Sequence, residues 1–174
     1  MVPSSAHSGT ARAARATFLL ERSQRVPRPL PEVFAFYANA ENLEVLTPRF
    51  LRFRILSPTP IEMRAGARID YQLTLFAVPL RWRTRITAWE PGVRFVDEQE
   101  SGPYASWRHT HTFEADGDGT LIHDHVAYAL PFGALGTLAH RLVIRRTLGR
   151  IFDFRHDAVA RVFGGGSVVE RPGS

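Results

Sequence analysis

The side chains best suited to chemistry are histidines and aspartates in one stretch of the chain, residues 107–128, WRHTHTFEADGDGTLIHDHVAY. His109 and His111 are two residues apart, a spacing that places both side chains on one face of a β-strand. Asp124 follows within the same stretch. A carboxylate beside an imidazole holds one tautomer and raises the pKa of the ring, as general bases require. His111 and Asp124 are therefore the candidate catalytic pair.

The turn inside this stretch sets the register of its two halves. A hairpin in which Asp116 pairs with Gly119 places His111 opposite Asp124. His109 then points to the same inner face, whereas the other two histidines of the stretch point outward. The inner group could be a buried polar network, a set of ligand-orienting side chains or a catalytic site, and the sequence leaves all three open.

The four histidines also raise the possibility of a metal site, because a His-x-His pair on a strand directs both rings to one side. The register opposes a four-histidine site, since His109 and His111 face inward while His123 and His125 face outward. Two histidines with Asp124 stay conceivable. The patterns HExxH, GxSxG, GxGxxG and an EF-hand loop are absent. We expect no metal ion and no cofactor.

A second hairpin is marked by Pro91 and Gly92, a signature of a type II turn. We pair Glu90 with Val93 across this turn. The pairing directs the following side chains toward the interior: Trp82, Thr84, Ile86, Phe95, Asp97 and Gln99. Two polar side chains, Asp97 and Gln99, are thus predicted inside.

The outer face of the same hairpin carries an arginine stripe at positions 81, 83 and 85. The register sets Arg85 opposite Glu98 and Arg83 opposite Glu100, which would stabilise the pairing by opposite charge. Arginines neutralised by neighbouring glutamates are poorly suited to phosphate contacts. We interpret the stripe as a solvated surface and expect no nucleic-acid partner, although the net charge of the chain is +5.

A long amphipathic helix is predicted from about Leu135 to Phe163. Its apolar side comprises Ile144, Leu148, Ile151, Phe152, Val159, Val162 and Phe163. Arg155 also projects within that side, where an unpaired charge would cost several kcal/mol. We therefore expect Arg155 to meet an anionic partner, either Asp124 or Asp97, with His111 beside them.

Composition excludes several classes of chemistry. All 22 cationic residues are arginine, so the chain has no lysine for a Schiff base or a GxxxxGK phosphate loop. Cysteine is absent, which excludes disulfides, thiol nucleophiles and thiolate zinc sites. No apolar run is long enough to span a membrane. We expect a soluble cytoplasmic protein without stable membrane insertion.

The order of elements predicts a single α+β domain over residues 17–163. A first strand (17–26) precedes two short helices that break at Asn39. A second strand is expected over residues 50–57, followed by a meander broken at positions 77–79 and 91–92, the hairpin above and the long helix. Residues 1–16 are expected to form a disordered tail and residues 164–174 a flexible one.

These elements, the run GPYASWRHTHTFEADGDGTLIHDHVAYALPFGALG and the helix with FDFRH resemble the SRPBCC superfamily. This superfamily contains the helix-grip proteins related to START domains and polyketide cyclases. The likeness is most specific to a bacterial subgroup whose pattern has three parts. These are a segment similar to WRHTHTF (107–113), a segment similar to DHVAYALPFG (124–133) and an arginine at the position of Arg155. The resemblance implies a helix-grip fold, in which a curled antiparallel sheet of about seven strands wraps a long C-terminal helix.

The resemblance also implies a cavity between sheet and helix that receives a small hydrophobic or amphipathic molecule. We expect the protein to bind or transport a lipid, a quinone or a polyketide-like compound. A cyclase or dehydratase that uses His111 and Asp124 is the alternative, and a protein that acts through protein partners is a third reading. The expected ligand-binding residues are Tyr71, Trp82, Asp97, Gln99, Trp107, His109, His111, Asp124, Tyr128, Leu148, Phe152 and Arg155.

Overall fold

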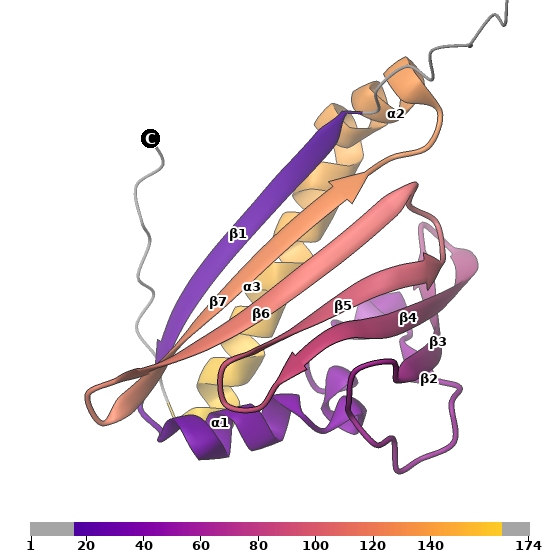
Figure 1. Cartoon of the computed structure of the whole chain (residues 1–174). Helices are drawn as coiled ribbons and strands as arrows, with labels where there is room; N and C mark the ends of the chain where they lie inside the picture. The colour runs from indigo at the N-terminus through magenta and orange to yellow at the C-terminus, as the bar shows by residue number, and fades with distance from the viewer. Residues whose placement is uncertain (1–15, 165–174) are drawn as a thin grey trace, which may run out of the picture.

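A computed structural model describes residues 16–164 of the chain. One seven-stranded antiparallel sheet forms the frame of the domain (Figure 1). In spatial order its strands are β1 (Thr17–Val26), β7 (Gly119–Ala129), β6 (Ser106–Asp116), β5 (Arg94–Ser101), β4 (Val78–Glu90), β3 (Arg68–Leu75) and β2 (Arg54–Ile55). Apart from the pairing of β1 with β7, every neighbour in the sheet is also a neighbour in sequence. The predicted α+β class and the number of strands are confirmed.

Helices occupy the two connections outside this meander. Between β1 and β2 lie α1 (Leu30–Tyr37) and two 3-10 turns, η1 (Ala40–Leu43) and η2 (Arg49–Leu51). After β7 come α2 (Gly133–Ala139), a π-helical turn η3 (His140–Ile144) and α3 (Arg145–Phe163). The predicted break at Asn39 is confirmed, because its side chain accepts a hydrogen bond from the backbone of Glu41 and starts η1.

The β6–β7 hairpin has the register expected from its turn. Asp116 pairs with Gly119, His111 with Asp124, and Phe113 with Ile122. The turn needs a left-handed residue, and glycine at position 117 supplies it with φ of +62°. The side chains predicted to face the helix, including both inner histidines, are therefore buried together.

The β4–β5 hairpin has the predicted register only in its central part. Arg85 pairs with Glu98 as expected, but Glu90 pairs with Arg94 instead of Val93. A β-bulge between Ile86 and Ala88 takes up this difference of one residue. The bulge preserves the inward direction of Trp82 and Asp97, which keeps the predicted inner face intact.

A second irregularity beside Arg83 changes the outer ion pairs. Arg83 pairs with Ser101 in the strand register and bonds Asp70 of β3 through two nitrogens, at 2.7 and 2.9 Å. Glu100 is bonded by Arg68 at 2.8 Å. The predicted pair between Arg83 and Glu100 is thus wrong, because the sequence did not reveal that β3 brings its own charges to this face.

We expect Arg83→Gln to leave the melting temperature of the protein almost unchanged. Its guanidinium is half exposed, so water replaces the lost ion pair. Thermal unfolding of the variant and of the wild type checks this. Tight, salt-dependent nucleic-acid binding that disappears in the variant would contradict our interpretation of this surface as solvated.

Two other predictions differ from the structure. Only residues 54–55 of the predicted strand 50–57 pair with β3, because η2 and the left-handed Arg52 turn the preceding backbone away. The long helix contains a π-helical turn at its N-terminal third, where His140 is buried and its Nε2 lies 2.8 Å from the Tyr128 hydroxyl. Val162, placed on the apolar side, is 44% exposed.

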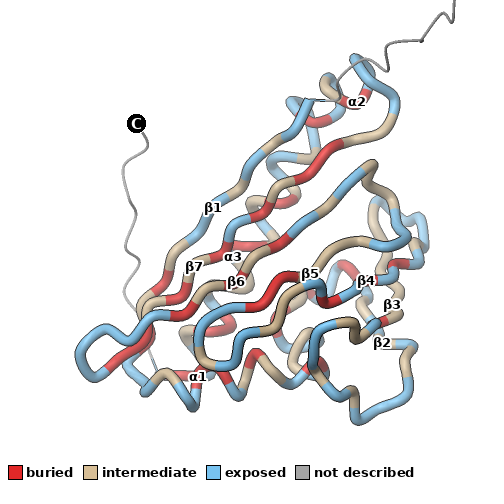
Figure 2. Tube along the Cα trace, in the orientation of Figure 1, coloured by how far each residue is buried: buried red, intermediate tan, exposed pale blue. Residues whose placement is uncertain are grey.

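The sheet and α3 enclose two apolar clusters with a gap between them. The first joins α1, the sheet and the end of α3, and includes Phe34, Phe113 and Val159. The second lies around Tyr128 and Phe152. Figure 2 shows the buried segments running along the central strands and α3. None of the helices in residues 16–164 is long and apolar enough to cross a membrane, and a cytoplasmic location stays a prediction.

The two predicted tails, residues 1–16 and 164–174, lie outside the described part of the chain, apart from residues 16 and 164.

Polar contacts hold the N-terminal strand β1 to α3. Gln24 donates a hydrogen bond to the backbone carbonyl of His156 at 3.0 Å, and Arg22 lies 3.3 Å from Asp153. These contacts fix the helix over the strands that carry the inner histidines.

Candidate ligand-binding cavity

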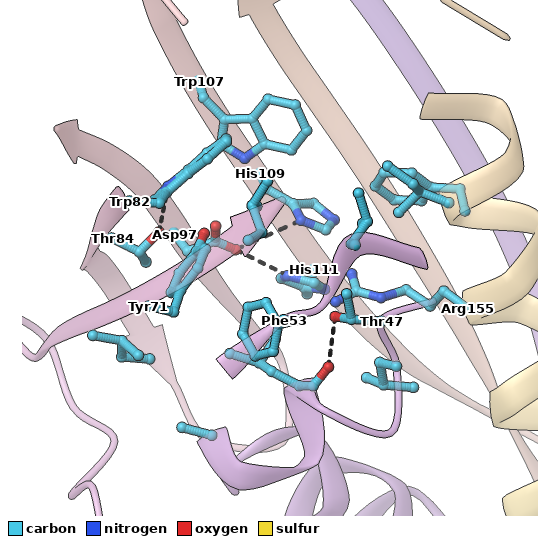
Figure 3. A pocket seen from close by; sticks show the side chains of 18 of the residues that line it. Thr47, Phe53, Tyr71, Trp82, Thr84, Asp97, Trp107, His109, His111 and Arg155 are labelled. Carbon is cyan, nitrogen blue, oxygen red and sulfur yellow. Dashed lines mark hydrogen bonds and ion pairs between the residues drawn. The ribbon is translucent and has the colours of Figure 1, made fainter. Parts of the chain in front are cut away.

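A cavity occupies the gap between the sheet and α3 (Figure 3). Its volume is about 180 Å³. Its walls come from the α1–η2 segment, strands β3 to β6 and α3. Most of the lining is aliphatic or aromatic, and a few polar side chains converge on one wall, as is usual for ligand pockets.

The aromatic wall is built from side chains of four segments that contact one another. Trp82 lies with its ring centroid 5.4 Å from those of Trp107 and Tyr104 and 5.8 Å from that of Tyr71. The indole nitrogen of Trp82 donates a hydrogen bond to Thr84 at 3.1 Å, which satisfies its polar group. These interlocking rings form a rigid surface on which a flat ligand can stack.

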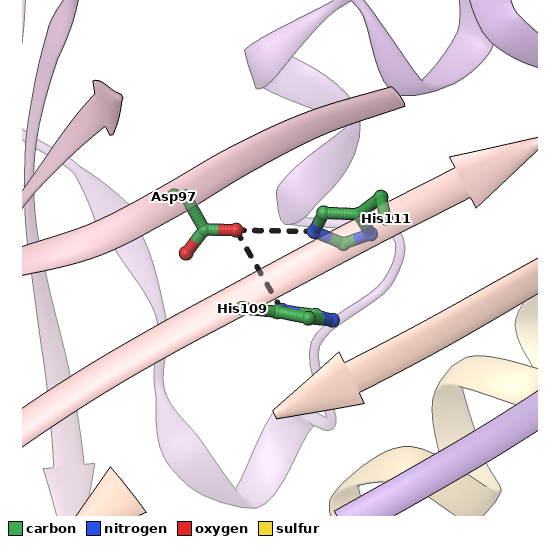
Figure 4. Close-up of side chains that lie close together, drawn as sticks. All are labelled: Asp97, His109 and His111. Atoms are coloured by element: carbon green, nitrogen blue, oxygen red, sulfur yellow. Dashed lines mark hydrogen bonds and ion pairs between the residues drawn. The ribbon is translucent and has the colours of Figure 1, made fainter. Parts of the chain in front are cut away.

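The polar wall is a cluster of two aspartates and two histidines on β5, β6 and β7, which we call the His–Asp cluster: Asp97, His109, His111 and Asp124. Asp97 Oδ2 lies 3.0 Å from His111 Nε2 and 3.6 Å from His109 Nδ1 (Figure 4). On the other side, Asp124 Oδ1 lies 2.9 Å from His109 Nε2 and 2.8 Å from His111 Nδ1. The latter contact has poor hydrogen-bond direction, so His111 Nδ1 has no hydrogen-bond partner.

Burial and charge act in opposite directions on the two histidines. Burial, together with the neighbouring His111, lowers the pKa of His109 to about 4, so this ring is neutral. Burial also opposes charge on His111, but Asp124 and Asp97 together raise its pKa above the ordinary value. The two carboxylates therefore favour the protonated form of His111, whereas they do not overcome burial at His109.

The carboxylates stay ionised in this environment. Burial would raise the pKa of both, yet the pKa of Asp97 is lowered by the two histidines and Arg155, and that of Asp124 is held well below its usual range by the two histidines. The two carboxylates give the cluster a negative charge, which protonation of His111 reduces. The nearby guanidinium of Arg155 balances that charge at longer range.

Arg155 does not form the ion pair that the sequence predicted. It lines the cavity, as its place on the apolar side suggested, but no carboxylate of residues 16–164 lies within ion-pair distance of it. Its guanidinium carbon lies 5.6 Å from the ring centroid of Phe152, a cation–π distance. The predicted ion pair with Asp124 or Asp97 is wrong, because the two histidines already occupy these carboxylates and Arg155 is only partly buried.

The structure brings nine of the twelve predicted ligand-binding residues to the cavity wall. The three others lie behind it. Gln99 bonds the backbone of Tyr104 through both atoms of its amide, at 2.8 and 3.1 Å. Asp124 lies behind the histidines, and Tyr128 is buried beneath the wall. The nine on the wall are Tyr71, Trp82, Asp97, Trp107, His109, His111, Leu148, Phe152 and Arg155.

Three aromatic residues of the wall were not predicted from the sequence. Tyr37 of α1 and Phe53 before β2 line the cavity, and so does Tyr104 between β5 and β6. The helical spacing of Tyr37 with Phe34 indicated an inward face but not a cavity. Tyr104 lies in a loop without periodicity, so only the inward direction of Gln99 could have suggested its place.

A sheet closed by a long C-terminal helix, with an aromatic cavity between them, defines a helix-grip protein. The family model described as "Polyketide cyclase / dehydrase and lipid transport" matches residues 26–154, and the chain belongs to this family. No curated protein is significantly similar to the chain in sequence.

Solved structures share the fold at low sequence identity. The protein CV1439 from Chromobacterium violaceum is 14% identical, with a TM-score of 0.63 over 84% of this chain and 96% of its own. The Zhui aromatase/cyclase from a Streptomyces species is also 14% identical, with a TM-score of 0.61 over 86% and 99%. A norcoclaurine synthase mutant from Thalictrum, solved with a transition-state analogue, is 13% identical, with a TM-score of 0.61 over 87% and 99%. At such identities the likeness shows the fold alone.

Proposed function

We propose that this protein binds a small amphipathic molecule in the cavity between the sheet and α3. The observation that carries the proposal is a cavity whose aromatic wall faces a compact polar cluster and a partly buried guanidinium that has no ion-pair partner among residues 16–164. Membership of a family described by lipid transport and by cyclase and dehydrase activities supports it. Burial of an apolar ligand body there would supply roughly 25 cal/mol per Å² of apolar surface removed from water.

The polar groups of the cavity favour a ligand with oxygen atoms. Arg155 forms no ion pair within residues 16–164, so its guanidinium N–H groups can donate to an oxygen. A carbonyl, phenolate or carboxylate would fit these donors, whereas the rings of Trp82 and Trp107 would stack on a planar body. A quinone or polyketide-like compound therefore suits the cavity better than a plain hydrocarbon chain.

Filling the cavity should abolish binding. Leu148 lies on the cavity wall and is 4% exposed. In Leu148→Trp the indole would occupy the space, so the affinity for an apolar fluorescent probe, anilinonaphthalene sulfonate, should fall at least tenfold. Titration monitored by the fluorescence of the probe measures this.

The matched control is Leu142→Trp on the same helical segment, where the side chain is 60% exposed and outside the cavity. This variant should bind the probe as the wild type does. A folded Leu148→Trp variant with unchanged affinity would show that the probe binds elsewhere and would overturn the proposed site. Both titrations are done on chelator-treated protein, so that metal content has no influence.

A second candidate function is catalysis of a cyclase or dehydratase type in the same cavity. The raised pKa of His111 on the cavity wall favours it, because this ring can pass a proton to a ligand oxygen that replaces Asp97 at its Nε2. His111 would then act as an acid, and Asp124 as a positioning residue behind it. Chemical change of a bound ligand by the wild type, with binding but no change by His111→Gln, would separate this function from simple binding.

A further inference from the structure

Three atoms of the His–Asp cluster that could bind a metal ion lie close together at the cavity wall. They are one carboxylate oxygen and one nitrogen from each histidine. Asp97 Oδ2, His109 Nδ1 and His111 Nε2 all lie within 4.8 Å of one another. Two of the separations are 3.0 and 3.6 Å, both measured from the carboxylate oxygen. Ligand atoms bound to one ion at about 2.0–2.2 Å lie roughly 3–3.5 Å apart. The two nitrogens are within 4.8 Å of each other, so small side-chain rotations, without rearrangement of the strands, would bring all three atoms to these distances.

Asp124 supplies the second feature of such a site. One oxygen, Oδ1, contacts the outer nitrogen of each ring, at 2.9 Å from His109 and 2.8 Å from His111. Metal-binding histidines usually place their second nitrogen against a carboxylate, which fixes the ring and directs the first nitrogen to the ion. Here Asp124 shares a hydrogen bond with the outer nitrogen of His109 and lies beside the outer nitrogen of His111, and the inner nitrogen of each ring points to Asp97 (Figure 4).

We infer that Asp97, His109 and His111 bind a divalent transition-metal ion at the cavity wall, with Asp124 orienting both rings. This inference goes beyond the proposed function and does not depend on which organic ligand the cavity takes. The three ligand residues line the cavity, whereas Asp124 does not. The remaining coordination positions of the ion would therefore face the ligand space.

Charge and ligand type support a metal of the zinc or iron(II) class. Two imidazole nitrogens and one carboxylate oxygen suit such borderline ions, whereas Ca²⁺ and Mg²⁺ prefer oxygen alone. The carboxylates of Asp97 and Asp124 together balance a dication. In the metal-free protein a hydrogen bond from His111 Nε2 to Asp97 takes the place of the metal bonds.

The rigid placement of the ligands further supports the site. Asp97 pairs with His109 across β5 and β6, and His111 pairs with Asp124 across β6 and β7. All four residues thus stand on neighbouring central strands, where side-chain positions are held more closely than in loops.

The test is a titration of the full chain, stripped of metal with a chelator, with Co²⁺ followed by visible absorption and with Zn²⁺ followed by calorimetry. We expect one-to-one binding, with the intense d–d bands of a four- or five-coordinate Co²⁺ ion. Asp124→Asn should weaken Zn²⁺ binding about 10–100-fold. Asp97→Asn and His111→Gln should weaken it at least as much.

The matched control is His125→Gln, which removes a half-exposed histidine from the outer face of β7 and should leave affinity unchanged. X-ray absorption of the zinc-loaded wild type should show two imidazole ligands, a result that needs no variant to fold. Absence of the Co²⁺ bands, or wild-type affinity in Asp97→Asn and His111→Gln, would overturn the inference. None of these outcomes bears on probe binding by the metal-free protein.

Discussion

Replacing Asp124 by alanine should lower the free energy of unfolding by about 3–5 kcal/mol. The Asp124 side chain is 10% exposed and contacts both histidines of the cluster through one oxygen. Its removal leaves the imidazolium of His111 buried with one carboxylate instead of two, and leaves the His109 nitrogen without an acceptor. Urea denaturation of the variant and the wild type measures the loss.

Arg155→Met serves as the control for Asp124→Ala. Arg155 also lines the cavity, where it makes a cation–π interaction with the ring of Phe152. Its removal should cost about 1 kcal/mol or less. An Asp124→Ala loss no larger than that of Arg155→Met would mean that the His–Asp cluster is solvated, and our description of the polar wall would be wrong.

Phe113→Ala should have an effect of similar size for an unrelated reason. The Phe113 side chain is 3% exposed, and its ring lies 5.1 to 6.0 Å from those of Tyr37, Phe34 and Phe95. Truncation leaves a void that these rings cannot fill, because they are held by the sheet and α1. Loss of a buried phenyl side chain costs about 3–5 kcal/mol.

The same substitution at Phe50, which is 56% exposed, is the control and should change stability little. Calorimetric unfolding of both variants gives the comparison. If Phe113→Ala lost no more stability than Phe50→Ala, the first apolar cluster would not be the packed core that holds α1 and α3 against the sheet.

The inner face of the β6–β7 hairpin could be predicted from sequence because two constraints agree. The turn after Asp116 permits few registers, and a shift of one residue would bury Glu114 and expose Phe113. The inward direction of His109 and His111 follows from the same alternation of inward and outward side chains. Their pairing with two different carboxylates did not follow, since the side-chain contact between His109 and Asp124 crosses the strand register diagonally.

Other features depend on long-range contacts that leave no local pattern. The bulge after Ile86 and the π-helical turn that buries His140 each insert a residue, and no residue type in the sequence marks where the insertion falls. The charge on Arg155 indicated correctly that a polar environment lies opposite α3. It did not indicate that the histidines would already hold both carboxylates.

Occupation of the cavity by a small molecule is the central prediction for this protein, and native mass spectrometry of the chelator-treated full chain tests it directly. We predict that the wild type carries one non-covalently bound molecule, either co-purified or the added anilinonaphthalene sulfonate. The same adduct should be present in Leu142→Trp and absent from Leu148→Trp. Adducts that are equal in all three proteins, or no adduct in the wild type after addition of the probe, would contradict the account.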